Sequence, residues 1–155
     1  HQIAHIFYVR GDLKSAENLY QQSLDIFESV GDQRSKIVTM ASMANLIQDN
    51  NPSKAIAIYV NALNTAKGLK SPFDIASILS MLSDPLIQKK ENRRALECLI
   101  EAFNYFVQLM AEPEVDTTIA RLKNMRAEIG KYDFDSLWSE ITHSPLPDWL
   151  SQSYQ

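Results

Sequence analysis

Three stretches of the chain align on an alanine: Gly11-Asp12-Leu13-Lys14-Ser15-Ala16, Asn51-Pro52-Ser53-Lys54-Ala55 and Asn92-Arg93-Arg94-Ala95. The three alanines are 39 and 40 residues apart. Four residues after each alanine stands a large residue, and seven after it a small one; these are Tyr20, Tyr59 and Leu99, then Ser23, Ala62 and Ala102. Small residues let helices approach closely, and large ones fill the space to a neighbour. The recurrence predicts a helical repeat of about 40 residues.

Apolar residues recur at helical spacing between these landmarks, and no stretch alternates as a strand would. Gly11, Gly31, Gly68 and Gly130 each follow a long helix-forming run, where a left-handed cap is expected. Pro52 and Pro72 sit where helices begin, and Ser71 is a candidate N-cap. We therefore predict an all-α fold with helices over Gln2–Arg10, Leu13–Val30, Gln33–Asp49, Pro52–Lys67, Pro72–Lys90, Asn92–Ala111, Glu114–Ile129 and Phe134–Ile141.

The first unit resembles the tetratricopeptide repeat (TPR) family. Its matching residues are Ile3-Ala4, Phe7, Gly11, Ala16, Tyr20 and Ser23, in the family's large-small, aromatic, glycine, alanine, aromatic, small order. Because the family's usual period is about 34 residues, the chain resembles its longer-period variants. The resemblance implies a right-handed superhelix, or α-solenoid, of stacked antiparallel hairpins. About three and a half units would span residues 1–131, the fourth having lost its small residue, since the repeat step reaches Lys123.

The sequence predicts different structures for the two ends of the chain. The first helix begins already inside the repeat pattern, which predicts that the chain is the C-terminal part of a longer array. Residues 132–155 read as a capping helix, Phe134–Ile141, and a proline-rich tail that is extended over Ser144–Leu150. This ending resembles the ends of repeat arrays in large, mostly cyanobacterial multi-repeat proteins.

In TPR-like arrays the first helices of successive units line a concave groove. Continuing the repeat register gives seven groove candidates: His5, Tyr8, Asn45, Gln48, Asp84, Gln88 and Asn124. Amide side chains carry both donors and an acceptor, so they could hold the main chain of an extended peptide. The alternative is that they are merely solvated. Pro85, inside one of these helices, would either kink it or break it in two.

The resemblance also argues against one mode of binding. Family members that grip C-terminal carboxylates use lysine and arginine in the groove, because an anion needs cationic partners. Here the corresponding positions hold His1, Ser42, Ser77 and Met81. The expected ligand is therefore a neutral, basic or amphipathic peptide, or another protein, and not a C-terminal carboxylate.

Composition and motifs argue against other functions. The formal net charge of −4 disfavours binding to nucleic acid or to an anionic membrane, and no apolar run is long enough for a membrane span. The only cysteine, Cys98, lies among apolar residues and fits a cytoplasmic protein, as a small core residue. His1 and His5 have metal-ligand spacing but no third ligand nearby. Without a phosphate loop or a catalytic constellation, we expect no enzyme, metal or cofactor.

The sequence therefore predicts a protein–protein interaction scaffold or adaptor. The alternative is a regulatory or sensor array that controls an attached effector domain. Self-association through the N-terminal face is a third possibility. An effector domain upstream in the full-length protein would favour the regulatory alternative.

Overall fold

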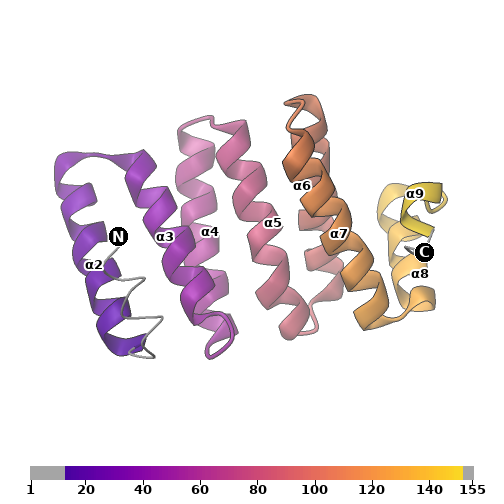
Figure 1. The fold of residues 1–155 in the computed structure, drawn as a ribbon, viewed down its shortest axis with the longest axis horizontal. Coiled ribbons are helices and arrows are strands. Elements are labelled where there is room, and N and C mark those ends of the chain that lie inside the picture. The colour runs from indigo at the N-terminus through magenta and orange to yellow at the C-terminus, as the bar shows by residue number, and fades with distance from the viewer. Residues whose placement is uncertain (1–12, 152–155) are drawn as a thin grey trace.

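The computed structural model describes residues 13–151, and over this range the chain is built from helices joined by short turns (Figure 1). The helices are α2 (Leu13–Val30), α3 (Gln33–Ile47), α4 (Pro52–Gly68), α5 (Pro72–Gln88), α6 (Asn92–Gln108), α7 (Glu112–Ile129), α8 (Lys131–Thr142) and α9 (Asp148–Ser151). There is no strand between residues 13 and 151. The all-α prediction is confirmed. The helix predicted over Gln2–Arg10 lies outside the described residues.

Two layers of helices form the array. From α2 to α8, each helix packs on the next along the chain, and α3 also contacts α5. Figure 1 shows α4 and α6 lying behind the layer that contains α3, α5 and α7. The described chain is therefore a row of antiparallel hairpins in which each hairpin covers a face of its neighbour, as expected for a solenoid.

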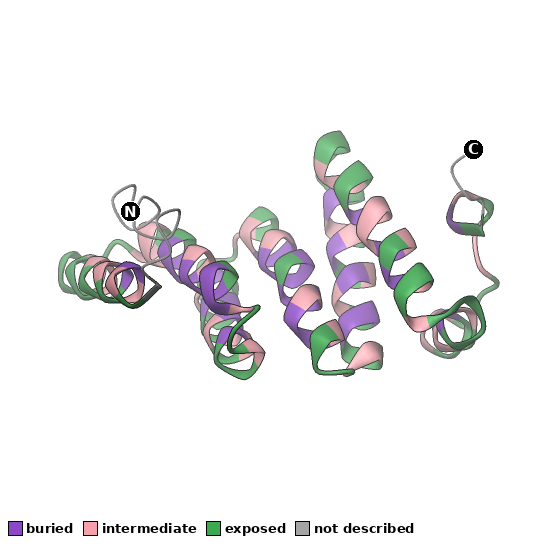
Figure 2. Cartoon of the chain, turned by 60° about the horizontal axis from the view of Figure 1, so that its bottom comes forward, coloured by how far each residue is buried: buried purple, intermediate pink, exposed green. Residues whose placement is uncertain are grey.

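The residues that define the repeat are the ones between the layers. Ala16, Ala55 and Ala95 have no exposed surface, and Tyr20, Tyr59 and Leu99 are buried. Ala44 and Ser83, the small residues of the first helices, are also fully buried. Figure 2 shows the buried residues where helices face one another and the exposed ones at the turns. These small side chains set how closely the helices approach.

Four helices, α2, α4, α5 and α6, end in the same backbone motif. At the end of α5, the N–H of Lys90 donates to the carbonyl of Ile87 (2.8 Å) and that of Glu91 to the carbonyl of Leu86 (2.9 Å), which is a Schellman motif. The residue in the left-handed conformation is Gly31 (φ 74°), Lys70 (51°), Lys90 (59°) or Met110 (53°). Gly68 was expected in this role but is the last residue of α4; Lys70 takes the left-handed conformation instead.

The helix starts are capped in different ways. The carboxylate of Asp32 and the amide oxygen of Asn51 each accept a backbone N–H three residues on, from Ser35 and Lys54, both at 3.0 Å. The hydrogen bonds from Ser35 lower the pKa of Asp32. Ser71 occupies the N-cap position of α5, but its hydroxyl donates to the Asp74 carboxylate (2.6 Å) and caps no backbone N–H.

Two features of the first helices differ from a regular TPR-like pattern. The helix α5 runs through Pro85, which is buried, and ends at Gln88, so the proline does not split it. In α7 the fully buried residues are Thr118 and Leu122, with Met125 next to them. These lie 39 residues after Leu79, Ser83 and Leu86 of α5. A large leucine thus occupies the position that is small in α3 and α5.

The C-terminal segment packs back onto the array. Arg126 of α7 donates two hydrogen bonds to the Asp135 carboxylate of α8, at 2.7 and 2.8 Å. Trp149 stacks on Phe103 of α6, with ring centroids 5.3 Å apart and 21° between the planes. Leu150 is 2% exposed. The tail is therefore extended only as far as Pro147 and then forms the short helix α9, in which Trp149 packs against α6 and α8 and Leu150 is buried.

Candidate peptide-binding groove

A cavity of about 360 Å³ opens on the layer of first helices. It lies between α3 and α5 and has one residue of α7, Arg121, at its edge. We call it the α3–α5 groove. The sequence register placed a groove on this layer because these helices are the first members of successive hairpins.

The groove is more apolar than the sequence analysis suggested. Val38, Phe73 and Met81 line it and are 50%, 45% and 37% exposed. Ile37 and Ile78 are buried among its lining residues. Large apolar side chains this exposed lose contact with water when a ligand covers them, which favours binding of an apolar group.

Polar groups surround this apolar surface. The amide oxygen of Asn45 accepts a hydrogen bond from Gln48 (3.1 Å), while its amide nitrogen has no partner among the described residues. Arg121 donates to the Asp84 carboxylate, and Asp74 lies 3.9 Å from Arg34 in addition to its bond with Ser71. Because both carboxylates are paired with cations, the groove is less acidic than its carboxylates alone suggest.

The predicted site residues are distributed unevenly. Asn45 lines the groove, and Gln48 bonds to it from the next turn of the same region. Gln48 keeps a buried amide oxygen without a partner. Gln88 donates to Asp49 (3.2 Å), which ties the ends of α5 and α3 together. Asp84 is half-buried beside Arg121. The structure therefore joins these residues in pairs and does not form one ladder.

The remaining predicted residues lie elsewhere. Asn124 is exposed on α7 and is not among the residues that line the groove. The 39-residue step to α7 puts Lys123, and not Asn124, in the register of Asn45 and Asp84. His5 and Tyr8 lie outside the described residues, as do His1 and the N-terminal face considered for self-association.

Sequence reasoning did not identify Phe73, Met81 or Arg121 as binding residues of the groove. Phe73 lies at the start of α5, before the register positions used for the prediction, and its ring packs edge-on against Phe106 of α6 (5.8 Å between centroids). Met81 was considered only as a position that lacks a cation. Arg121 was missed because a long side chain reaches the groove from a helix one repeat away. The groove therefore contains a cation, which is neutralised by Asp84.

The described residues offer few other reactive or ligand-binding groups. Burial raises the pKa of the Cys98 thiol to about 11, so little thiolate forms at neutral pH. Arg93 pairs with Glu140 of α8, and Arg94 pairs with Glu91, so both arginines are already bound to carboxylates. No group of three potential metal ligands lies together between residues 13 and 151. Over the same range, no helix is long and apolar enough to cross a membrane.

Comparison with known proteins gives structural matches only. No protein-family model and no curated protein sequence matches the chain. A crystal structure of BtubC (BKLC) from P. vanneervenii matches 88% of the chain with a TM-score of 0.77 and 22% identity. Two structures of the nearly identical TPR-like repeats of a Podosopora anserina protein of the kinesin light chain type match 92% and 96% of it. Their TM-scores are 0.73 and 0.72, at 12% and 13% identity.

The chain spans 57% of the length of BtubC, and 71% and 75% of the two Podosopora anserina structures. Structural matches at this level of sequence identity establish the fold of the chain, but they do not assign it the function of the matched proteins. The structural matches agree with two features of the structure, namely its helical hairpins in register and its buried alanines at the repeat positions. The chain has the fold of the TPR-like helical repeat proteins.

Proposed function

We propose that this chain is a non-enzymatic protein-interaction module that binds an extended peptide segment of a partner in the α3–α5 groove. The observation that carries the proposal is the cluster of Val38, Phe73 and Met81, three large apolar side chains exposed in one concavity. None of the other large apolar side chains that are exposed among the described residues lines this concavity. An exposed apolar patch bordered by polar groups is typical of a binding surface.

The chemistry of the groove limits the partner. One aliphatic or aromatic side chain of the peptide would enter between Val38, Phe73 and Met81. The free amide nitrogen of Asn45 would donate to a carbonyl of the peptide main chain. Because Arg121 is already paired with Asp84, it offers little to an anionic ligand, which favours a neutral or basic peptide over a C-terminal carboxylate.

The experiment is a selection of random peptides displayed on phage against the immobilised protein, followed by calorimetry with the enriched sequence as a synthetic peptide. The key variant is Val38→Glu, which places a charge in the apolar part of the groove. Its control is Val107→Glu on α6. The two valines are almost equally exposed, at 50% and 49%, but Val107 does not line the groove.

We expect Val38→Glu to weaken binding about tenfold or more, the loss that corresponds to about 1.4 kcal/mol of binding free energy. Val107→Glu should bind as the wild type does. Asn45→Ala should give a smaller loss, of about threefold, because only one hydrogen bond is removed. If no sequence is enriched, or if both valine variants bind equally, the groove is not the binding site.

A further inference from the structure

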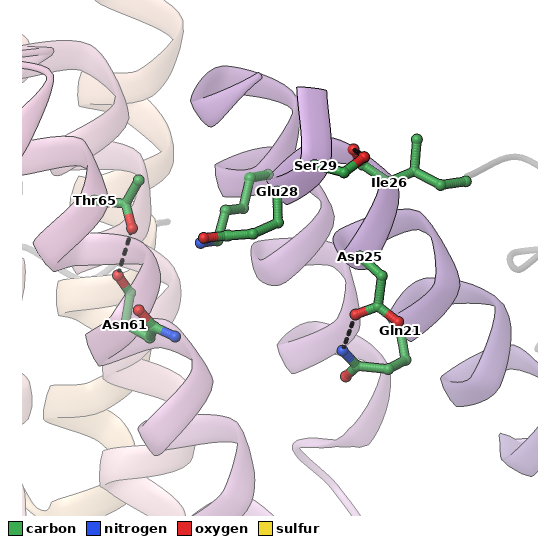
Figure 3. A network of polar contacts seen from close by, with 8 residues as sticks. Gln21, Asp25, Ile26, Glu28, Ser29, Asn61 and Thr65 are labelled. Atoms are coloured by element: carbon green, nitrogen blue, oxygen red, sulfur yellow. Dashed lines mark hydrogen bonds and ion pairs between the residues drawn. The ribbon is translucent and has the colours of Figure 1, made fainter. Parts of the chain in front are cut away.

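A second cavity, of about 440 Å³, lies on the other layer between α2 and α4, above α3. Its apolar lining comes from all three helices: Leu24, Met40, Met43 and Ile58. Figure 3 shows Gln21, Asp25 and Glu28 of α2 on one side of this space and Asn61 and Thr65 of α4 on the other. We call it the α2–α4 groove. It does not share a lining residue with the α3–α5 groove.

The repeat itself shows what fits such a groove. Leu24 is eight residues after Ala16, and Phe103 is eight residues after Ala95, so the two occupy equivalent positions on α2 and α6. Phe103 is covered by Trp149, whose ring also packs edge-on against Trp138 of α8 (6.5 Å between centroids). The space between α6 and α8 therefore takes an aromatic residue of the chain's own tail, followed by the buried Leu150. No residue between 13 and 151 fills the equivalent space between α2 and α4.

The charges around the α2–α4 groove indicate that its ligand differs from the chain's own tail. Among the charged residues of the α2–α4 groove, Lys36 pairs with Glu28, and Lys54 pairs with Glu17 at the edge. Asp25 is exposed and accepts one hydrogen bond, from the neutral Gln21 amide (3.0 Å), and no cation in the part of the chain that the structure describes pairs with it. The chain's own tail carries Asp148 next to Trp149, and a second tail would bring that negative charge towards Asp25. A basic residue there would be attracted instead.

We propose that the α2–α4 groove binds a short segment of a partner protein that presents an aromatic-aliphatic pair with a lysine or arginine beside it. The apolar pair packs on the partly exposed Leu24 and Ile58, with the buried Met40 and Met43 beneath them, as Trp149 and Leu150 pack on the other end of the array. The basic side chain pairs with Asp25. This site is independent of the proposed peptide groove, since it lies on the other layer and has different residues.

The test uses two synthetic peptides and the complete chain. The first peptide is Ser144–Ser151 with Asp148→Lys, and the second is the same segment unchanged. Binding is followed by anisotropy of a fluorescein label on each peptide, and its location by NMR of the chain labelled with ¹³C at the methionine methyl groups. Met40 and Met43 report on the α2–α4 groove, Met81 on the α3–α5 groove, and Met125 on α7, the helix that α9 contacts.

We expect the lysine peptide to shift the Met40 and Met43 signals and to leave Met81 and Met125 unchanged. The unchanged peptide should bind about three- to fivefold more weakly, the range of one partly exposed ion pair. Asp25→Asn should remove that difference between the peptides. Asp116→Asn, at an exposed position on α7, should preserve it.

Three results would overturn the proposal: no shift at Met40 and Met43 with millimolar peptide, shifts confined to Met81 or Met125, or an unaltered preference for lysine in Asp25→Asn. Shifts at Met81 alone would place the peptide in the α3–α5 groove. A negative result in this test does not change the interpretation of the phage selection and the valine variants. The proposals for the two grooves can therefore be refuted separately.

Discussion

The adjacent residues Lys89 and Lys90 provide a direct test of the backbone conformation in the turns between helices. Lys89 is the C-cap residue of α5 and has a negative φ (φ −81°, ψ 1°), and Lys90 follows with a left-handed backbone (φ 59°). Both side chains are exposed, so replacement by glycine removes little packing. The two variants Lys90→Gly and Lys89→Gly therefore have the same chemistry at positions with opposite backbone requirements.

The expected magnitudes follow from the backbone. The left-handed conformation costs an L-residue about 1–2 kcal/mol, and glycine avoids this cost. Glycine in return loses more conformational freedom on folding, which costs about 0.5–1 kcal/mol. Lys90→Gly should therefore raise the free energy of unfolding by about 0.5–1 kcal/mol. Lys89→Gly gains nothing from the left-handed region and should lower it by about 0.5–1 kcal/mol.

The assay is urea unfolding followed by circular dichroism at 222 nm. With a slope of about 2 kcal/mol per M, Lys90→Gly should move the midpoint up by about 0.25–0.5 M and Lys89→Gly should move it down by a similar amount. If Lys90→Gly is no more stable than the wild type, or if both variants shift in the same direction, Lys90 does not carry backbone strain in a Schellman turn.

Two further predictions concern packing and charge. Ala55→Leu should lower the free energy of unfolding by about 1–3 kcal/mol through overpacking, because Ala55 is fully buried. Ala57→Leu, on the exposed side of α4, should change the free energy of unfolding little. Thermal denaturation compares the two variants, and equal melting temperatures would contradict the packing described. The hydrogen bonds from Arg126 lower the pKa of Asp135, so this pair stabilises the fold above the unfolded carboxyl pKa of about 4 and the contribution is lost as the pH falls through the lower folded value. Since the Asp135 side chain is 40% exposed, Asp135→Asn should cost no more than about 1 kcal/mol at pH 7 and nothing near pH 2; a constant difference in unfolding free energy over that range would contradict it.

Local sequence signals predicted most of the helices because they act over short distances. The bounds of α2 agree with the prediction, and the buried alanines and tyrosines of the repeat lie where their spacing placed them. The ends of α5 and α6 were extended too far. The apolar pattern of α6 continues into its turn, where Leu109 and Met110 are exposed, and in both turns the left-handed residue, Lys90 or Met110, gives no glycine signal.

The groove was harder to predict because its character depends on contacts between repeats. Asn45 and Asp84 follow from the register, but the pairing of Asp84 with Arg121 depends on how far α7 lies from α5. Phe73 and Met81 have the same apolar character as core residues. Their exposure becomes apparent only when the helices that could cover them are in place.

The pairing of consecutive helices also affects how the chain folds. In the described array, most packed pairs are neighbours along the chain, such as α3 with α4 and α5 with α6, and the other pairs skip only one or two helices, as Phe103 of α6 with Trp149 of α9 does. This low contact order means that little loop-closure entropy opposes the first contacts. Adjacent hairpins can start to assemble before the rest of the polypeptide has been synthesised.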